Sequence, residues 1–356
     1  MPRRLFRGFF MGDIGFMKRA IELARKGAGR VSPNPMVGAV VVRDGDSIGE
    51  GYHAEYGATH AEVNAMGNGE VKGATLYVTL EPCNHYGHTP PCTEKIVSEK
   101  IRRVVVGSID PNPRMQGISL DRLKGSGIDV DVGVLQNETD GLIRFYSHWI
   151  QTGRPYVTVK LALSGDGFIA RPEGTPEWIS CVESRTDVHR MRAEYDAVLV
   201  GTNTVRVDNP ALTVREVSGR NPNRVVIDRQ GRIDRSARVF AGSAEKVFYF
   251  STVRRNDLHS AVHQTRLDPE QFNLSTILTI LGGNNQLSVL VEGGASIAES
   301  FIRENLCNEV VIYRSLTHLG SGIGFDESTV RVYGFRVIDQ TRSGVDRKIT
   351  YRREHV

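Results

Sequence analysis

The chain has 356 residues, of which 40% are hydrophobic and 24% are charged, a composition typical of soluble globular proteins. Single hydrophobic cores usually stop growing at about 250–300 residues, so this length favours two domains. The 45 basic and 41 acidic residues leave a formal net charge of +4, which is too small to indicate a nucleic-acid partner. No apolar run approaches the roughly 20 residues that span a bilayer, which excludes a transmembrane protein.

The N-terminal segment and the cysteines indicate the compartment. Residues 1–7 have the basic start of a signal peptide, but Gly8, Gly12 and Asp13 interrupt the apolar stretch that should follow. Four cysteines in a chain of this length are too few for a disulfide framework. We therefore expect a cytoplasmic protein with reduced thiols.

The first half of the chain alternates between helix and strand patterns. Residues 13–28 carry apolar side chains three to four positions apart, which predicts an amphipathic helix. The apolar run at 37–42 predicts a buried strand, and Asp44-Gly45 predicts a tight turn into a second strand. The elements expected after this turn are the rest of the second strand to Tyr52, a helix from His60, a strand at 74–80, a helix at 92–100 and strands at 103–107 and 128–130.

The pattern restarts at residues 151–155, so we expect one domain over residues 1–150 and another over residues 151–356. The second half again alternates strands and helices and shows no internal repeat. Its expected strands cover 156–163, 197–201, 224–228, 246–250, 288–291 and 309–313, and its expected helices cover 183–194 and 295–304. This alternation predicts layered α/β folds for both halves.

Four residues of the first half match a catalytic zinc site. His60 and Glu62 lie at the start of a predicted helix, Cys83 follows an apolar strand, and Cys92 comes nine positions later. One imidazole and two thiolates supply three metal ligands and leave the fourth tetrahedral position for water, as catalytic sites do. Zinc bound in this way lowers the pKa of its water to about 7.

Glu62 is the predicted catalytic residue of this site. Deamination needs a group that takes a proton from water and passes protons to the ring nitrogen and to the departing ammonia. A carboxylate two residues from the histidine ligand can do this without binding the metal, and the His-x-Glu and Pro-Cys pattern is the signature of zinc-dependent nucleobase deaminases. We also expect a helix N-terminus beside Cys83 to favour its thiolate form.

A structural zinc site is the alternative interpretation of the same residues. It needs a fourth ligand, which His85 or His88 could supply from the segment between the two cysteines. Because a structural site leaves Glu62 without a role, we favour the catalytic interpretation.

In the second half, residues 288–298 read as an apolar strand that ends in Glu292-Gly293-Gly294 and opens a helix. Glycines at such a turn let a phosphate approach backbone N–H groups at the helix N-terminus. Many strand-to-helix turns carry paired glycines for steric reasons alone. The turn by itself therefore supports a phosphate site only as a hypothesis.

Several motifs together resemble one family. Eight residues separate the two cysteines, whereas cytidine and transfer-RNA adenosine deaminases have Cys-x-x-Cys. The matching motifs are Pro33-Asn34-Pro35, Gly49-Glu50-Gly51-Tyr52-His53, His60-Ala61-Glu62-Val63, Thr79-Leu80-Glu81-Pro82-Cys83, Thr89-Pro90-Pro91-Cys92 and Asp110-Pro111-Asn112-Pro113. With these motifs the chain resembles, from about residue 13 onward, the bifunctional riboflavin-biosynthesis deaminase/reductase family.

The resemblance implies a cytidine-deaminase-like, three-layer α/β/α N-terminal domain and a dihydrofolate-reductase-like α/β C-terminal domain. It implies zinc-dependent deamination of 2,5-diamino-6-(5-phosphoribosylamino)pyrimidin-4-one, followed by NADPH-dependent reduction of the ribosyl side chain to ribityl. The expected partners are this small-molecule substrate and further copies of the chain in a homo-oligomer, with no nucleic acid and no membrane.

The resemblance also assigns residues to the two sites. In the first domain Asn34 and the segment beginning at His85 are implied to contact the substrate. The positions implied to contact NADPH are Leu163, Trp178, Thr204, Asp208, Gly294, Ala295, Ser296 and Ile297. The positions implied to contact the reductase substrate are Arg192, Leu212, Arg215 and Glu292. Lys160 and Asp208 are candidates for proton transfer and orientation, although either could instead belong to a surface ion pair.

The sequence departs from the family pattern at a few positions. His88 stands where the family usually has Arg or Lys, and Ile118-Ser119 replaces a basic-Gly pair. Gly165 replaces a common Leu, and Pro176 replaces a Ser that often contacts substrate. These changes bear on substrate contacts more than on the fold.

Two other functions are compatible with parts of the sequence. A deaminase of nucleic-acid bases with a non-catalytic C-terminal binding module would share the zinc signature, but it predicts Cys-x-x-Cys and a basic stripe. A binding protein that kept the fold without activity is the second alternative, and the intact zinc signature argues against it for the first half.

Overall fold

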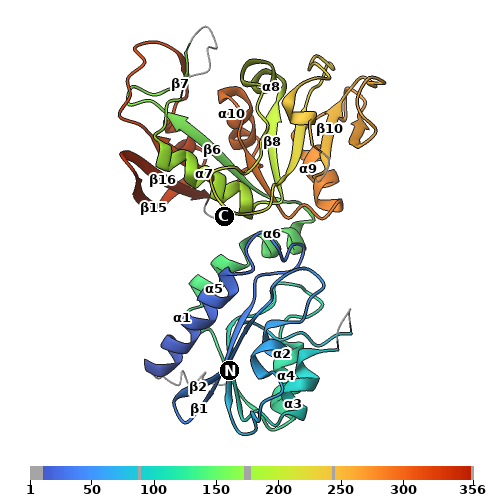
Figure 1. Cartoon of the computed structure of the whole chain (residues 1–356), viewed down its shortest axis with the longest axis vertical. Helices are drawn as coiled ribbons and strands as arrows, with labels where there is room; N and C mark the ends of the chain where they lie inside the picture. Colours follow the sequence, from blue (N-terminus) through green and yellow to red (C-terminus); the bar gives the residue numbers. More distant parts are fainter. Residues whose placement is uncertain (1–10, 87–89, 172–177, 243–244, 354–356) are drawn as a thin grey trace. The chain divides into compact units, whose positions relative to one another are not determined.

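The protein is described by a computed structural model of residues 11–86, 90–171, 178–242 and 245–353 (Figure 1). The chain divides into two compact units, Met1–Thr152 and Gly153–Val356. Among the described residues, no helix combines the length and the apolar character that crossing a membrane requires.

The first unit is built on a five-stranded sheet with the order β2-β1-β3-β4-β5. Its strands are β1 (Gly38–Arg43), β2 (Asp46–Tyr52), β3 (Thr75–Leu80), β4 (Arg103–Ser108) and β5 (Asp129–Val132). β1 runs antiparallel to β2 and β3, whereas β3, β4 and β5 are parallel. The turn between β1 and β2 has positive φ at Asp44 (52°) and Gly45 (92°), as the predicted two-residue hairpin turn requires.

Helices cover both faces of this sheet. They are α1 (Met11–Arg25), α2 (Ala61–Met66), α3 (Cys92–Ser98), α4 (Ile118–Gly125), α5 (Gln136–Leu142) and α6 (Arg144–Thr152). Successive strand residues point to opposite faces, so Val41 packs in a core with α2, α3 and α4, whereas Val40 packs in a core with α1 and α5. The three-layer α/β/α prediction is confirmed.

The second unit is built on a nine-stranded sheet with the order β11-β10-β9-β8-β12-β6-β13-β16-β15. These strands are β6 (Tyr156–Leu163), β8 (Ala197–Gly201), β9 (Asn223–Ile227), β10 (Val247–Ser251), β11 (Val262–Arg266), β12 (Ser288–Val291), β13 (Glu309–Arg314), β15 (Phe335–Ser343) and β16 (Asp346–Arg353). The strands from β11 to β13 are parallel, and β16 and β15 add an antiparallel hairpin at one edge. A separate pair joins β7 (Phe168–Ala170) to β14 (Ile323–Gly324).

The helices of the second unit lie on both faces of its sheet. They are α7 (Val182–Glu194), α8 (Thr202–Asp208), α9 (Leu274–Gly283), α10 (Ala295–Arg303) and α11 (Ser328–Val332), with a 3₁₀ turn at Arg238–Phe240. Apolar residues of α9 and α10, among them Leu281 and Phe301, belong to the main core of the sheet. Val188 of α7 packs with Val311 and Tyr313 on the other face of β13. The α/β prediction for this half is confirmed.

Several elements were not expected from the sequence. α4, α5, α6, α8 and α9, strand β11 and the β15–β16 hairpin are additional, and the first helix covers 11–25 rather than 13–28. α8 has only seven residues and includes β-branched Thr and Val, which are weak helix formers. Most of β15 is exposed, so its sequence lacks the apolar alternation that predicts a half-buried strand.

Candidate deaminase and reductase sites

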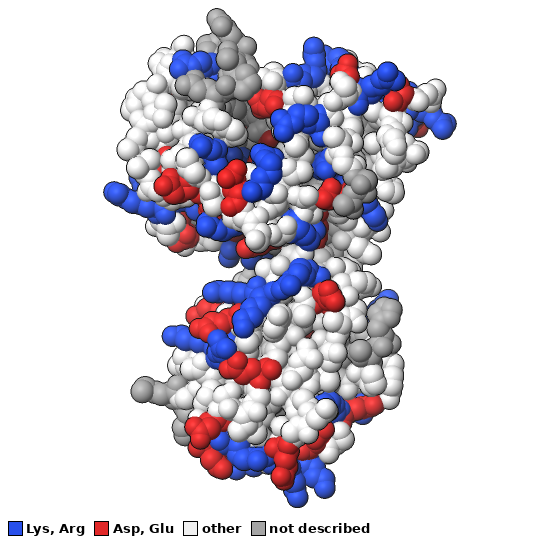
Figure 2. Space-filling model, viewed as in Figure 1, with Lys and Arg blue, Asp and Glu red and all other residues white. Residues whose placement is uncertain are grey.

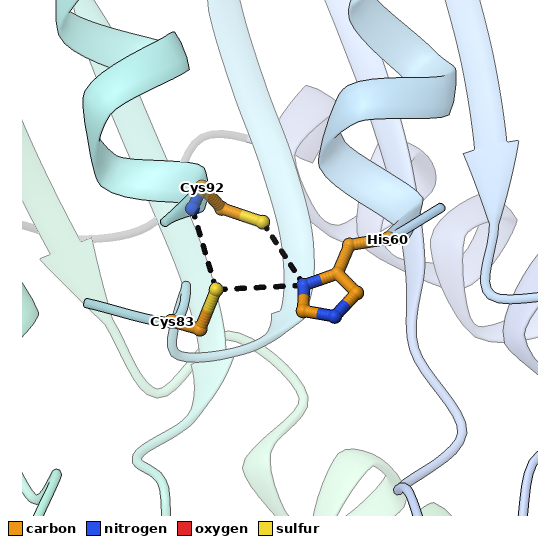
Figure 3. A group of neighbouring side chains, drawn as sticks. All are labelled: His60, Cys83 and Cys92. Atoms are coloured by element: carbon orange, nitrogen blue, oxygen red, sulfur yellow. Dashed lines mark hydrogen bonds between the residues drawn. The ribbon is translucent and has the colours of Figure 1, made fainter. Parts of the chain in front are cut away.

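Three potential zinc ligands meet where the carboxyl end of β3 faces the starts of two helices (Figure 3). His60 precedes α2, Cys83 follows β3, and Cys92 is the first residue of α3. His60 Nδ1 lies 3.2 Å from Cys92 Sγ and 3.4 Å from Cys83 Sγ. The structure therefore brings together the three ligands that the sequence predicts.

The geometry of this group fits zinc. All three ligand atoms lie within 4.8 Å of one another. Tetrahedral zinc with Zn–N and Zn–S bonds of about 2.0 and 2.3 Å separates nitrogen from sulfur by roughly 3.5 Å, close to the separations found here. The backbone N–H of Cys92 donates to Cys83 Sγ at 3.3 Å, so the start of α3 lies beside this thiolate as expected. Hydrogen bonds from Cys92 and His60 lower the pKa of Cys83 to about 4.

Glu62 lies in the first turn of α2, beside the ligands but outside the group of three. Its side chain is only 3% exposed. Burial and, to a lesser extent, the charge of Cys83 raise the pKa of Glu62 to about 6, against the opposing effects of the His60 charge and of a hydrogen bond with Cys92. A buried carboxyl with such a pKa can both accept and release a proton near neutral pH.

A buried histidine that the sequence did not single out completes this region. His53 is 3% exposed, and its ring meets that of His60 edge-on at 5.6 Å between centroids. Its Nδ1 lies 3.2 Å from the Thr59 carbonyl oxygen, and its Nε2 lies 3.1 Å from Asn34 Nδ2. Because the Asn34 amide nitrogen donates, Nε2 accepts and Nδ1 carries the proton. Burial lowers the pKa of His53 and so favours this neutral form.

The structural-zinc alternative finds no support among the described residues. His85 is exposed and lies outside the group formed by His60, Cys83 and Cys92. His88 and the rest of 87–89 lie outside the described part of the chain. Three ligands with a buried carboxyl beside them correspond to the catalytic type of zinc site.

In the second unit, the expected cofactor residues gather at the carboxyl ends of three neighbouring parallel strands. Thr204 and Asp208 lie on α8 after β8, Gly294 to Ile297 open α10 after β12, and Leu163 ends β6. A Cβ atom added to Gly201 would lie 3.6 Å from Ile297 Cδ1, which shows how closely α8 and α10 begin. Ligands of open α/β sheets bind at such carboxyl ends.

Two of the residues expected to contact the cofactor, Leu163 and Trp178, differ from the others in their burial. Leu163 is fully buried in the core, and its carbonyl oxygen accepts from the backbone N–H of Ser315 at 2.8 Å. The side chain of Leu163 therefore packs in the hydrophobic core. Trp178 is 74% exposed, with the Arg185 guanidinium 4.8 Å from the centre of its ring.

A charged cluster lies beside the same edge of the sheet. Arg192 on α7 donates to both oxygens of Glu292, from Nε at 2.6 Å and from Nη2 at 2.8 Å. Burial alone would raise the pKa of Glu292, but the charge and hydrogen bonds of Arg192 hold it below its usual value. Burial lowers the pKa of Lys160 on β6, and Glu292 opposes this shift. Lys160 itself is half-buried.

The remaining expected substrate residues surround this cluster. The backbone N–H of Arg215 donates to Nδ1 of His189, whose pKa is lowered by burial. The Arg215 side chain is exposed and donates to Thr213 Oγ1 at 2.9 Å. Leu212 is buried with φ of +56°, a left-handed conformation that costs a branched residue free energy and occurs often at functional sites. Asp208 is exposed, although partial burial of its carboxyl raises its pKa.

The structure accounts for one departure from the family pattern. A Cβ atom at Gly165 would lie 2.9 Å from Cε1 of His318, so the imidazole occupies the space that a larger residue at 165 would need. Ile118 is 50% exposed at the start of α4. Pro176 lies in the segment 172–177, outside the described residues.

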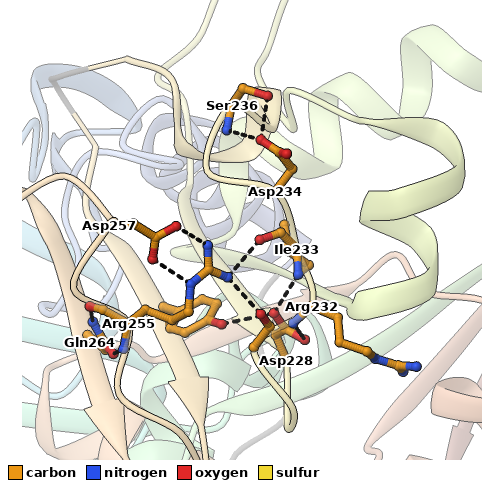
Figure 4. A network of polar contacts seen from close by, with 10 residues as sticks. Asp228, Arg232, Ile233, Asp234, Ser236, Arg255, Asp257 and Gln264 are labelled. Carbon is orange, nitrogen blue, oxygen red and sulfur yellow. Dashed lines mark hydrogen bonds and ion pairs between the residues drawn. The ribbon is translucent and has the colours of Figure 1, made fainter.

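Asp228, at the carboxyl end of β9, bonds to Arg232 and Ile233 of the loop that follows this strand (Figure 4). It is fully buried and accepts four hydrogen bonds. The donors are Thr202 Oγ1 (3.0 Å), Tyr249 Oη (2.9 Å) and the backbone N–H groups of Arg232 (3.0 Å) and Ile233 (2.9 Å). Because Thr202 begins α8, Asp228 connects this helix to the loop after β9.

Asp228→Asn should lower the free energy of unfolding of the second unit by about 2–3 kcal/mol. The amide presents a donor to groups that are themselves donors, so buried polar atoms lose their partners. Urea titration should show the loss. Asp234→Asn is the matched control, because the Asp234 carboxylate accepts from the nearby Ser236 on an exposed turn, and it should change stability by less than about 0.5 kcal/mol. Equal stability of the Asp228 variant and the parent would contradict the role of this carboxylate.

Comparisons with known proteins match each half of the chain to a known domain. Residues 12–108 match the cytidine and deoxycytidylate deaminase zinc-binding region, and residues 155–340 match the RibD C-terminal domain. The riboflavin biosynthesis protein RibD of Aquifex aeolicus is 40% identical over 90% of this chain and 91% of its own length. RibD of Escherichia coli strain K12 is 37% identical over 87% of this chain and 89% of its own length.

Solved structures agree with the sequence relatives. A diaminohydroxyphosphoribosylaminopyrimidine deaminase/5-amino-6-(5-phosphoribosylamino)uracil reductase from Thermotoga maritima is 39% identical, with a TM-score of 0.89, and the match covers 96% of this chain and 99% of that one. Acinetobacter baumannii RibD is 35% identical, also with a TM-score of 0.89, over 97% of this chain and 99% of that one. These matches confirm the resemblance found in the sequence, and the chain belongs to the RibD family of riboflavin biosynthesis proteins.

Proposed function

We propose that this chain catalyses two consecutive steps of riboflavin synthesis on one small-molecule substrate. The first unit converts 2,5-diamino-6-(5-phosphoribosylamino)pyrimidin-4-one and water into the corresponding uracil and ammonia. The second unit reduces the ribosyl side chain of that product to ribityl with NADPH. The buried carboxyl of Glu62 beside three zinc-type ligands carries the proposal, because a purely structural metal site has no use for it.

In the deaminase unit, His60, Cys83 and Cys92 would hold the zinc ion, which when bound activates a water molecule for attack on the carbon that bears the amino group. Glu62 takes a proton from this water and delivers it to the ring nitrogen. Glu62 then takes the remaining proton from the hydroxyl that has been added to the carbon and gives it to the amino group, so that the C–N bond breaks, ammonia leaves and a carbonyl remains. Asn34 binds the pyrimidine through its carbonyl oxygen, while His53 accepts from its amide nitrogen and fixes its orientation.

In the reductase unit, bound NADPH would provide the hydride for reduction at C1 of the ring-opened ribosylamine. Residues 294–297 and Thr204, at the carboxyl ends of β12 and β8, hold this cofactor. Lys160 gives the substrate nitrogen the proton that balances the hydride. Glu292 attracts the Lys160 ammonium and is itself held by Arg192, while Arg215 binds the sugar phosphate.

A deaminase of nucleic-acid bases is the weaker candidate. It would carry a concentrated basic surface, whereas the face in Figure 2 shows Lys and Arg interspersed with Asp and Glu over each unit. Eight residues separate Cys83 from Cys92, against two in the nucleic-acid deaminases. The second unit matches the RibD C-terminal domain rather than a nucleic-acid binding module.

The proposal also covers the cellular compartment in which the enzyme works. Its four cysteines are free in the structure, which supports a reducing compartment such as the cytoplasm. We also propose that the active form is a homo-oligomer, which sedimentation of the purified chain will test.

Removal of zinc should abolish deamination and leave reduction intact. The purified chain should hold about one zinc per molecule, as a three-ligand catalytic site requires. Dialysis against a chelator should stop ammonia release from the diaminopyrimidine, and added zinc should restore it. Oxidation of NADPH with the already deaminated substrate should continue unchanged, because the potential ligands all lie in the first unit. Ammonia release by a metal-free chain would refute the proposed chemistry.

A further inference from the structure

The residues on both sides of Cys83 bond to one and the same segment of the chain. Glu81, two positions before the cysteine, is 4% exposed. Its Oε2 accepts from the backbone N–H groups of Asp110 (3.1 Å) and Gly117 (3.0 Å). Its Oε1 accepts from the backbone N–H (3.2 Å) and the hydroxyl (2.6 Å) of Ser119. The segment 110–119 therefore wraps around this one carboxylate.

Asn84, directly after the cysteine, bonds to the helix that follows this segment. Its Oδ1 accepts from Arg122 Nη1 on α4 at 2.7 Å and from Thr93 Oγ1 at 2.8 Å. The backbone N–H of Thr93 in turn donates to the Cys83 carbonyl oxygen at 3.2 Å. The backbone on either side of Cys83 is thus tied to residues 110–122 and to the start of α3.

The hydrogen-bond acceptor sites of the Glu81 carboxylate are all used. A carboxylate offers about four acceptor sites, and four donors fill them here. Three of these donors are backbone groups, so their positions follow from the path of the chain. Buried hydrogen bonds to a charged acceptor are among the stronger ones in proteins, and a donor that loses its acceptor pays the full cost of desolvation. The position of Glu81, and of the backbone leading to Cys83, is therefore closely determined.

The side chain of Ser119 contributes to this arrangement. The hydroxyl supplies the shortest of the four bonds, at 2.6 Å. A glycine at position 119 would keep the backbone bond and lose this one. The Ser119 hydroxyl, which a glycine lacks, thus adds a hydrogen bond to Glu81, two residues before the zinc ligand Cys83.

We propose that Glu81 and Asn84 are positioning residues that hold the Cys83 thiolate where it can bind zinc together with His60 and Cys92. The inference rests on the zinc site of the proposed function and extends it to residues that touch neither metal nor substrate. Groups of this kind, which orient metal ligands from behind, typically change metal affinity by about 10- to 100-fold when they are replaced.

Glu81→Gln in the full-length chain tests this proposal. The amide keeps the size of the side chain but turns one acceptor oxygen into a donor that faces donors in either orientation. Competition with the chromophoric chelator 4-(2-pyridylazo)resorcinol should show zinc affinity lowered by about 10- to 100-fold. The visible spectrum of the cobalt-substituted chain should shift, because it reports the geometry of the thiolate ligands. NADPH oxidation with the deaminated substrate should be unchanged, which shows that the second unit is intact, and a parent-like circular dichroism spectrum should show that the first unit, which contains Glu81, is folded.

Two further variants make the test secure. Ser119→Ala removes only the hydroxyl and should lower zinc affinity roughly fivefold or more, even if Glu81→Gln fails to fold. Asp121→Asn is the matched control, because Asp121 is an exposed carboxylate on the same helix, and its zinc affinity should equal that of the parent. Parent-like affinity and cobalt spectra in folded Glu81→Gln and Ser119→Ala chains would overturn this inference and leave the proposed function intact. A parent chain without zinc affinity would overturn both.

Discussion

Glu62→Gln should slow deamination by about 10²- to 10⁴-fold, the usual contribution of general acid–base catalysis. Glutamine has nearly the same shape, so the first turn of α2 and the neighbouring ligand His60 should keep their positions. It cannot take a proton from water or deliver one to the leaving amino group. The zinc content should therefore stay at the parent level while ammonia release falls.

The measurement is ammonia release from the diaminopyrimidine under saturating substrate, with zinc determined on the same sample. Glu55→Gln is the matched control, because Glu55 is an exposed carboxylate shortly before His60 and should leave the rate unchanged. NADPH oxidation with the deaminated substrate reports the second unit and should also be unchanged. A Glu62→Gln chain that retains zinc and full deamination would remove this residue from the mechanism.

Lys160→Met should slow the reduction of the deaminated substrate by about 10²-fold or more, because the variant lacks the proposed proton donor. Methionine fills a similar volume without a charge. Glu292 keeps its two hydrogen bonds from Arg192, so the rest of the charged cluster should keep its structure. Deamination should proceed at the parent rate.

The pH dependence of reduction distinguishes a proton donor from a packing residue. Burial lowers the pKa of Lys160, and the side chain donates a proton only while it is charged. The rate in the parent should therefore fall as the pH rises through a pKa below the usual 10.5 of lysine, and the Lys160→Met variant should lack this decline. Lys246→Met, at an exposed position, is the control and should keep the parent profile. Parent-like rates in the Lys160 variant would show that another group supplies the proton.

The zinc ligands could be predicted from the sequence because their order along the chain reflects local structure. His60 stands just before a helix, Cys83 just after a buried strand and Cys92 at the next helix start, and α2 and α3 pack in the same core on one face of β3, which brings these ends together. Glu62 follows from its two-residue distance to His60. Site residues that lie at the ends of helices and strands, or two positions apart, can therefore be predicted from a single sequence.

The supporting residues could not be predicted because distant segments supply them. His53 reaches Asn34 from the position directly after β2, and Glu81 holds residues that begin 29 positions later. In the second unit, the contact of His189 with Arg215 likewise exists only in the folded chain. For His53 the Gly-Tyr-His motif was a usable signal, whereas no local pattern distinguishes Glu81 from a surface carboxylate.

The fold, like the sites, could be predicted where local sequence patterns reflect the structure and not where tertiary contacts decide it. Apolar strands such as β1 and β6 stand out because their residues are buried on both faces of a sheet. The β15–β16 hairpin pairs with β13 at one edge of the sheet and leaves most of β15 exposed, so hydrophobic patterning gave little indication of it. α8 begins at Thr202, whose hydroxyl is held by the buried Asp228, a tertiary contact that local helix propensity does not contain.

The most direct test of the account follows ammonia and NADPH together in one reaction of the purified, zinc-containing chain with the diaminopyrimidine phosphoriboside. We predict that ammonia release precedes NADPH oxidation and that the two reach equal amounts, since each substrate molecule loses one amino group and then gains one hydride. Oxidation of NADPH without ammonia release, or ammonia release with no subsequent oxidation, would contradict the assignment of two consecutive activities to this chain.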